Sequence, residues 1–265
     1  MNIKVLFEDK NILVLDKPAG ISVHPDGKSK AKTVSDWLLL NYPDIKDVGE
    51  PFWVDKKGGE QEKVLRPGIV HRLDKETSGA LLVAKNEETF ISLKEQFQKH
   101  KIKKTYRAFV YGYVTDPKAS LATGKRGVIN VPIGRSQKDI CTFTAGRGAR
   151  EPIKDAITEY IILNKFTDVK NEESKKKIEH QYSYIEAYPK TGRTHQIRVH
   201  MRYINHPIVS DPLYKGSKEN ALGMDRLALH AFSITFTLPG GEIKTVESPL
   251  PVDFKKALKT YLDIS

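Results

Sequence analysis

The stretch that decides the fold is GIVHRLDKETSGALLVAK, which occupies residues 68–85. Its last part, Gly79–Lys85, is an apolar run that predicts a buried strand. Asp74 precedes this strand, between the cations Arg72 and Lys75, and turn-forming residues follow it. One interpretation is a simple Asx or Ser/Thr turn whose charges lie in water. The other is a carboxylate that the adjacent cations keep ionised, held on a short connector as a nucleophile or base.

Strand and helix signals on both sides of this stretch indicate an α+β protein. Helices are expected after the N-cap residues Thr33 and Asn86, and an amphipathic helix is expected near the C-terminus. Because strands dominate and no βαβ alternation is sustained, we expect a mixed, largely antiparallel sheet flanked by helices and loops. The other expected strands are residues 5–7, 12–15, 105–114, 156–163, 182–188 and 232–238.

The remaining segments read as connections. Residues 49–63 are Gly-rich and charged, which predicts a mobile surface loop. Residues 122–151 predict loop and hairpin, and a Lys/Glu-rich turn is expected near residues 170–180. No linker is long or Pro/Ser-rich enough to force a division, so we expect one domain over residues 1–265, with the option of two lobes.

Composition limits the class of protein. The chain of 265 residues has 44 Lys and Arg against 33 Asp and Glu, a net charge of +11. Such a balance indicates either a polyanionic partner, which would be nucleic acid or an anionic membrane surface, or a basic surface that only confers solubility, and charge alone does not favour one over the other. The single cysteine, Cys141, excludes an intrachain disulfide framework and a multi-cysteine metal site. Neither a signal peptide nor an apolar stretch of about 18 residues is present, so we expect a cytoplasmic protein.

The sequence lacks the motifs of several common enzyme chemistries. The sequence has no P-loop, no His-Glu-x-x-His zinc pattern and no Gly-x-Ser-x-Gly nucleophile turn. We therefore expect no nucleotide-binding loop, no metal and no cofactor.

The segment around Asp74 carries a resemblance to a known family. His71-Arg72-Leu73-Asp74 with Thr77-Ser78-Gly79 resembles the H-R-L-D-x-x-T-S-G signature of the RluA family of pseudouridine synthases. The segments DKPAG at 16–20, KTYRA at 104–108 and TGRTHQIRVH at 191–200 are similar to further family segments, in the same order. The chain starts close to the first of these, so we expect no separate N-terminal RNA-binding module of the S4 type.

The resemblance implies a fold, a reaction and a partner. The fold would be that of a pseudouridine synthase catalytic domain with a central RNA-binding cleft. The enzyme would isomerise uridine to pseudouridine in structured RNA, either large-subunit ribosomal RNA or tRNA. It would act as a monomer, without a cofactor and without a membrane.

The resemblance also implies three catalytic residues. Asp74 would act at the ribose, either by adding to C1′ or by removing a proton from C2′. Arg198 would pair with Asp74, on a helix over residues 194–204 capped by Thr194; without the resemblance, Arg198 reads as an exposed helix arginine, and a strand is the alternative for this segment. Tyr106 would stack on the uracil and assist proton removal at C5, whereas its ordinary reading is a core aromatic residue of a strand.

Two basic segments are candidate RNA surfaces. Residues 94–107 could form a phosphate-contacting rim or only a solvated helix end, and residues 123–150 are a second candidate clamp. Arg72 is the candidate wedge that fills the space left by an extruded nucleotide, with a plain phosphate contact as the alternative. The candidate RNA-binding residues are His71, Arg72, Lys101, Lys103, Lys104, Arg107, Arg126 and Arg193.

Two other functions compete with this hypothesis. A non-catalytic RNA-binding protein that retains the fold would not need an aspartate close to RNA phosphates. A glycosidase that uses Asp74 and Glu76 would need a separated acid and base, and a basic surface suits a neutral glycan poorly.

Overall fold

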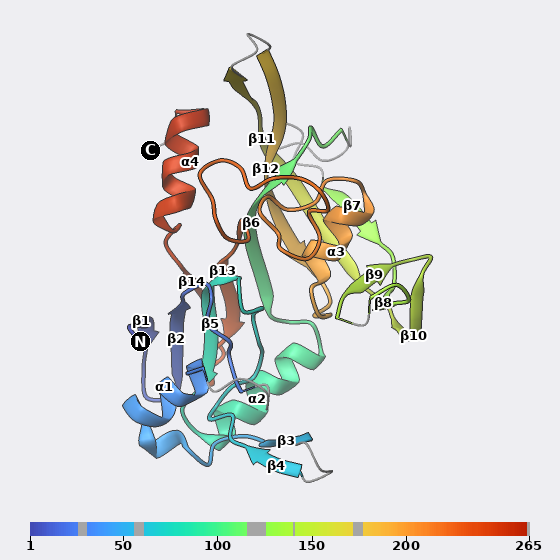
Figure 1. The fold of residues 1–265 in the computed structure, drawn as a ribbon. Helices are drawn as coiled ribbons and strands as arrows, with labels where there is room; N and C mark the ends of the chain where they lie inside the picture. The colour runs from blue at the N-terminus through green and yellow to red at the C-terminus, as the bar shows by residue number, and fades with distance from the viewer. Residues whose placement is uncertain (26–30, 56–60, 116–125, 140, 172–176, 264–265) are drawn as a thin grey trace. The chain divides into compact units, whose positions relative to one another are not determined.

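The computed structural model describes residues 1–25, 31–55, 61–115, 126–139, 141–171 and 177–263. The chain forms two compact units, which we call unit 1 and unit 2. Unit 1 comprises Met1–Lys104 and Ala231–Pro249, and unit 2 comprises Thr105–His230 and Leu250–Ser265. The chain passes from one unit to the other within strands β6 (Lys103–Tyr111) and β13 (Leu229–Thr237), and again between Pro249 and Leu250 (Figure 1).

Unit 1 is a sheet with short helices. Its strand order is β1-β2-β5-β13, with β14 paired to β13. Helix α1 begins after Thr33, whose hydroxyl accepts from the Asp36 backbone while the Asp36 carboxylate accepts from the Thr33 backbone, as in a capping box. The elements are β1 (Lys4–Glu8), β2 (Ile12–Lys17), α1 (Val34–Asn41), the 3-10 turn η1 (Pro43–Ile45), β3 (Phe52–Asp55), β4 (Gln61–Val64), β5 (Ser78–Ala84), α2 (Glu87–Gln98) and β14 (Ile243–Glu247).

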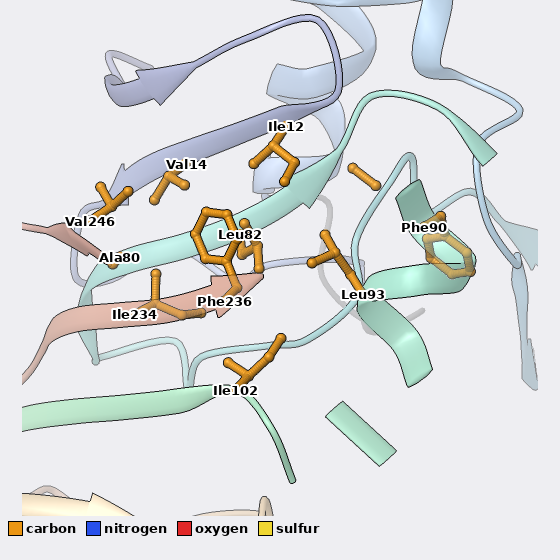
Figure 2. Close-up of a cluster of buried hydrophobic side chains, with 11 residues drawn as sticks. Ile12, Val14, Ala80, Leu82, Phe90, Leu93, Ile102, Ile234, Phe236 and Val246 are labelled. Atoms are coloured by element: carbon orange, nitrogen blue, oxygen red, sulfur yellow. The ribbon is translucent and has the colours of Figure 1, made fainter. Parts of the chain in front are cut away.

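The core of unit 1 lies between its sheet and α2 (Figure 2). Phe90 and Leu93, on the apolar stripe of α2, pack with residues of β2, β5, β13 and β14. Asn86 caps α2 by accepting from the Thr89 backbone, as the sequence predicts. The labelled core residues are Ile12, Val14, Ala80, Leu82, Phe90, Leu93, Ile102, Ile234, Phe236 and Val246.

Unit 2 contains a second run of strands in the order β6-β12-β11-β7 and a small three-stranded sheet in the order β10-β8-β9. Its core includes stacked and edge-on aromatic rings, with Phe109 contacting Phe166, Tyr184 and Phe254. The elements are β6 (Lys103–Tyr111), β7 (Gly127–Asn130), β8 (Ile133–Ser136), β9 (Phe143–Ala145), β10 (Ala149–Lys154), β11 (Ile157–Asn171), β12 (Lys177–Pro189), α3 (Gln196–Tyr203), the first two residues of β13, and α4 (Val252–Leu262).

The α+β class with a largely antiparallel sheet is confirmed. Each strand pair with a defined register is antiparallel, and the expected strands and helices are present with shifted ends. The expectation of a single domain with the option of two lobes stays a prediction, and the two compact units are compatible with it.

Two expectations about connections need correction. Residues 49–63 are not simply a surface loop, because β3 and β4 form an antiparallel ribbon there; residues 56–60 lie outside the described ranges. The turn near 170–180 is much shorter, because β11 and β12 stay paired as far as Asn171 and Lys177. A ribbon satisfies its backbone hydrogen bonds whatever its side chains, so polar composition hid both features. Within the second candidate clamp, Lys125 also lies outside the described residues.

Candidate active site

Asp74 lies on a tight turn in unit 1 that is held by a buried lysine. The Thr77 backbone donates to the Asp74 carbonyl at 3.1 Å, and the Asp74 side chain is half-buried. Lys17, with 0% of its surface exposed, donates to the carbonyls of Pro18, Ile21 and Lys75. Lys17 thus donates to three backbone oxygens, one of them beside Asp74, and the Lys75 carbonyl also accepts from the Gly20 backbone at 2.9 Å.

A close backbone approach fixes the other end of this turn. Gly79, the second residue of β5, has φ of +116°. A Cβ atom at this position would lie 2.2 Å from the Ala231 carbonyl oxygen, a distance that no side chain permits. The glycine of the signature segment is therefore needed to seat the strand that follows Asp74.

His71 anchors the segment that leads to Asp74. Its Nε2 accepts a hydrogen bond of 2.9 Å from the Leu82 backbone, and its ring stacks on Phe97 at 4.9 Å. Burial, helped by the nearby charges of Lys104 and Arg66, lowers the pKa of His71 to about 3. The imidazole is therefore neutral at physiological pH and acts as an acceptor in this contact. A role of His71 in binding RNA stays a prediction.

Tyr106 is a buried side chain of β6 in unit 2. Tyr106 is 9% exposed and lies opposite Ala187 in the β6–β12 register. The next residue, Arg107, faces Glu186 in the same register and forms an ion pair with it at 2.5 Å. The alternation of strand side chains therefore directs Tyr106 and Arg107 to opposite faces of the sheet.

Arg198 is a buried arginine in a two-point ion pair. Its Nε and Nη2 each donate to the Asp211 carboxylate at 2.8 Å, and the two side chains are 3% and 0% exposed. Asp211 also accepts from the backbones of Leu213 and Tyr214. The guanidinium plane is thus fixed, with three of its five N–H donors directed elsewhere than to Asp211.

Helix α3 carries Arg198, but two details of its prediction are wrong. The helix begins after His195, which has φ of +55° and makes no side-chain cap, and not after Thr194. Arg198 does not lie on an exposed face, because six consecutive residues from Gln196 to Met201 are buried. The polar side chains of this run find partners: Gln196 donates to Ile157 and Thr158, and His200 contacts Thr158 and Val131.

Three candidate RNA-binding arginines of unit 2 are already engaged by protein groups. Arg107 pairs with Glu186, Arg193 donates to the Asp155 carbonyl, and Arg126 pairs with Glu159 at 2.6 Å. The Arg126 guanidinium also lies 3.8 Å from the centre of the Tyr188 ring. Their predicted contacts with RNA would have to compete with or add to these interactions.

The candidate cations of unit 1 have a different environment. Arg72, Lys101 and Lys103 are exposed and have no ion-pair partner within the described ranges. Lys104 is half-buried, with its ammonium 6.0 Å from the Phe97 ring, and burial lowers its pKa to about 8. Lys101, Lys103 and Lys104 are therefore not equivalent, since only Lys101 and Lys103 are exposed.

The site residues divide between the units. Asp74, His71 and Arg72 belong to unit 1, and Tyr106 and Arg198 belong to unit 2. Sequence reasoning assigned no role to Lys17 or Asp211, although Lys17 lies in a segment that carries the resemblance. A lysine that ends a strand of apolar residues, next to a proline, was the available signal for Lys17. Asp211 gave no signal, because its partner lies thirteen residues away on α3.

The described residues contain no group of three or more His, Cys, Asp or Glu side chains arranged to hold a metal ion. None of the helices in the described ranges is long and apolar enough to cross a membrane.

Comparison with known families decides the class of this site. A family model of RNA pseudouridylate synthases matches residues 11–203, which include Asp74, Tyr106 and Arg198. The chain belongs to this family. The resemblance found in the sequence is thereby confirmed, and the chain is classed as an RNA pseudouridine synthase, an isomerase.

Relatives of this synthase family match over almost all of the chain. An uncharacterized RNA pseudouridine synthase of Bacillus subtilis is 34% identical over 98% of the chain and 73% of the relative. The ribosomal large subunit pseudouridine synthase D of Nitrosomonas europaea is 34% identical over 99% of the chain and 66% of the relative. The solved structure of human RNA pseudouridylate synthase domain containing 1 shares the fold, with a TM-score of 0.67, 24% identity, and coverage of 94% of this chain and 84% of that chain.

Proposed function

We propose that this synthase isomerises uridine to pseudouridine at specific positions of structured RNA, with Asp74 as the group that acts at the ribose. The observation that carries the proposal is the anchored turn of Asp74. The fully buried Lys17, at the end of β2, donates to the carbonyl of Lys75, the residue that follows Asp74. A half-buried carboxylate fixed in this way is suited to attack C1′ or to remove the C2′ proton.

Arg198 and Tyr106 complete the proposed chemistry. Arg198 would pair with Asp74 through donors that Asp211 does not use, because a guanidinium can bind two carboxylates at once. Such a pair would fix the rotamer of Asp74 and keep its charge. Tyr106 would place its ring against the uracil, and its hydroxyl would assist removal of the C5 proton after the base has turned and rejoined C1′.

The reaction demands that the nucleotide leave its stack, because C1′ and the base are otherwise enclosed. Extrusion costs a few kcal/mol, which binding must supply. Arg72, exposed and two residues before Asp74, is placed in the chain to enter the vacated space. The RNA would be large-subunit ribosomal RNA or tRNA. The name of the Nitrosomonas europaea relative favours ribosomal RNA. The synthase would act as a monomer in the cytoplasm.

The direct test uses RNA that carries tritium at C5 of uridine. Formation of pseudouridine replaces the C5 hydrogen, so the purified protein should release tritium to water from ribosomal RNA or tRNA isolated from cells that lack the gene. Mapping pseudouridines in cells with and without the gene then names the position. A protein that binds these RNAs but releases no tritium from either would be a binding protein that retains the synthase fold.

A further inference from the structure

The β3–β4 ribbon of unit 1 has two different faces. Phe52 lies opposite Val64 and Trp53 lies opposite Lys63 in its antiparallel register. Because strand side chains alternate, the Phe52–Val64 pair and the Trp53–Lys63 pair project from opposite sides of the ribbon. We call the side with Trp53 and Lys63 the outer face.

Contacts on the other side fix the orientation of the ribbon. Phe52 places its ring edge-on to His24, at 4.8 Å between centroids, and the Arg66 guanidinium lies 5.5 Å from the same ring. Val64 is 8% exposed. The Phe52 side is thus packed against the body of unit 1, which leaves the outer face to solvent.

Trp53 is a large aromatic side chain that remains mostly exposed to solvent in the folded protein. It is 59% exposed, whereas the second tryptophan, Trp37, is half-buried and contacts Tyr42. Its cross-strand neighbour Lys63 is also exposed. Side chains directly opposite in an antiparallel pair have Cβ atoms about 5 Å apart, so a ring face and a cation lie side by side on the outer face.

The ribbon also lies next to the segment that carries Asp74. Arg66, which contacts Phe52, lies close enough to Arg72 and His71 to interact with them electrostatically. Burial, and after it the charge of Arg72, lowers the pKa of Arg66. The charge of Arg66 in turn contributes to the lowered pKa of His71. The Arg66 Nε is buried without a hydrogen-bond partner within the described part of the chain. Two arginines, Arg66 and Arg72, therefore lie along the chain between the ribbon and the turn of Asp74, and the carboxylate of Glu50 acts on Arg66 in the opposite sense.

We propose that Trp53 and Lys63 bind an unpaired nucleotide of the RNA substrate beside the uridine that reacts, with the indole stacked on its base and the ammonium against its phosphate. An exposed ring beside a cation is the arrangement with which proteins hold single-stranded RNA, because every base offers a π-face and every linkage a phosphate. This inference rests on the proposed function for its ligand. Since the subsite holds a flanking nucleotide, it governs affinity and leaves the chemical step unchanged.

The fluorescence of Trp53 tests the stacking directly. In a Trp37→Phe background, Trp53 is the only tryptophan, and base stacking quenches indole emission. Titration with oligouridylate should quench this emission with the same midpoint as binding measured by anisotropy of a labelled RNA. Emission that stays constant while the RNA binds would overturn the proposal.

Substitutions test the contribution of each side chain. Trp53→Ala should weaken binding of substrate RNA by about 5-fold to 100-fold, with tritium release at saturating RNA nearly unchanged, and Trp53→Phe should retain most of the affinity. Lys63→Gln should lower the slope of log affinity against log salt by about 0.7. The matched control is Tyr203→Ala, which removes an aromatic residue that is 50% exposed in unit 2 and should leave affinity unaltered. Wild-type affinity of Trp53→Ala would refute the subsite, whereas absence of tritium release from the wild type would refute the proposed function alone.

Discussion

Asp211 holds Arg198 by both Nε and Nη2 at 2.8 Å, in a pair that is almost wholly buried. A bidentate contact fixes the plane of a guanidinium as well as its position, and the backbones of Leu213 and Tyr214 fix the Asp211 carboxylate in turn. The orientation of Arg198 is therefore set by unit 2 itself before any RNA binds. Asp211 is a positioning residue for the arginine that we propose to serve Asp74.

Asp211→Asn should destabilise the protein strongly. The asparagine amide carries no negative charge, and its NH₂ group can face the N–H groups of Arg198. The buried guanidinium is then left without a compensating charge. Breaking a buried pair by removing one partner costs about 3–5 kcal/mol in free energy of unfolding, which urea denaturation measures.

The control for this experiment is an exposed ion pair. Glu50 and Lys94 form a pair with side chains that are 68% and 39% exposed, so Glu50→Gln should cost less than about 1 kcal/mol. Equal losses in the two variants would contradict the assignment of Asp211 as the support of a buried arginine.

Arg198→Met should impair the chemistry more than the binding of RNA. Methionine fills much of the buried volume but offers no donor to a carboxylate, so kcat should fall much further than affinity. Arg198→Lys is the informative second variant, because it keeps the charge and loses the bidentate geometry, and it should also have a low kcat. A loss confined to affinity would make Arg198 an RNA contact.

Lys101 and Lys103 should contribute more than Lys104 to the salt dependence of RNA binding. Replacing Lys101 and Lys103 together by Gln should flatten the slope of log affinity against log salt by about 1.4, or about 0.7 for each phosphate contact. Lys104→Gln should change this slope less, because the Lys104 ammonium lies against Phe97 and its pKa is lowered to about 8. Slopes equal to that of the wild type for the double variant would remove residues 101–103 from the RNA surface.

His71 should make the protein less stable in mild acid. The unfolded chain protonates His71 below its ordinary pKa of 6.5, whereas the folded protein resists protonation down to about pH 3. The stability that the neutral ring provides is therefore present above pH 6.5 and is lost progressively as the pH falls towards 3, by up to about 1.4 kcal/mol per pH unit.

His71→Gln removes this titration and keeps an acceptor for the Leu82 backbone. Free energies of unfolding for both proteins between pH 7 and pH 4 provide the measurement. The gap between wild type and variant should narrow or reverse as the pH falls, and parallel curves would show that His71 is not held neutral.

The sequence predicts well those features that depend on neighbours along the chain. The caps at Thr33 and Asn86 and the apolar strand after Asp74 are local signals, and all three were correct. The signature segment was also sufficient to find the family, because its residues are contiguous.

Features that depend on distant partners were missed. In the sequence alone, Arg198 resembles a solvent-exposed helix residue, because its partner Asp211 is distant along the chain. Thr194 is not the N-cap, because His195 precedes the helix in a left-handed conformation that the sequence pattern does not predict. The sequence did not predict the β3–β4 ribbon because its two strands are only four residues long and flank a charged, Gly-rich segment.

The central claim is that the Asp74 carboxylate performs the chemistry, and activity of Asp74→Asn tests it most directly. The amide keeps the shape of the side chain and loses its charge and nucleophilicity, so tritium release from C5-labelled RNA should be undetectable. RNA affinity should remain close to that of the wild type, because a carboxylate contributes nothing attractive to phosphates. Measurable release of tritium by the purified Asp74→Asn protein would contradict the account.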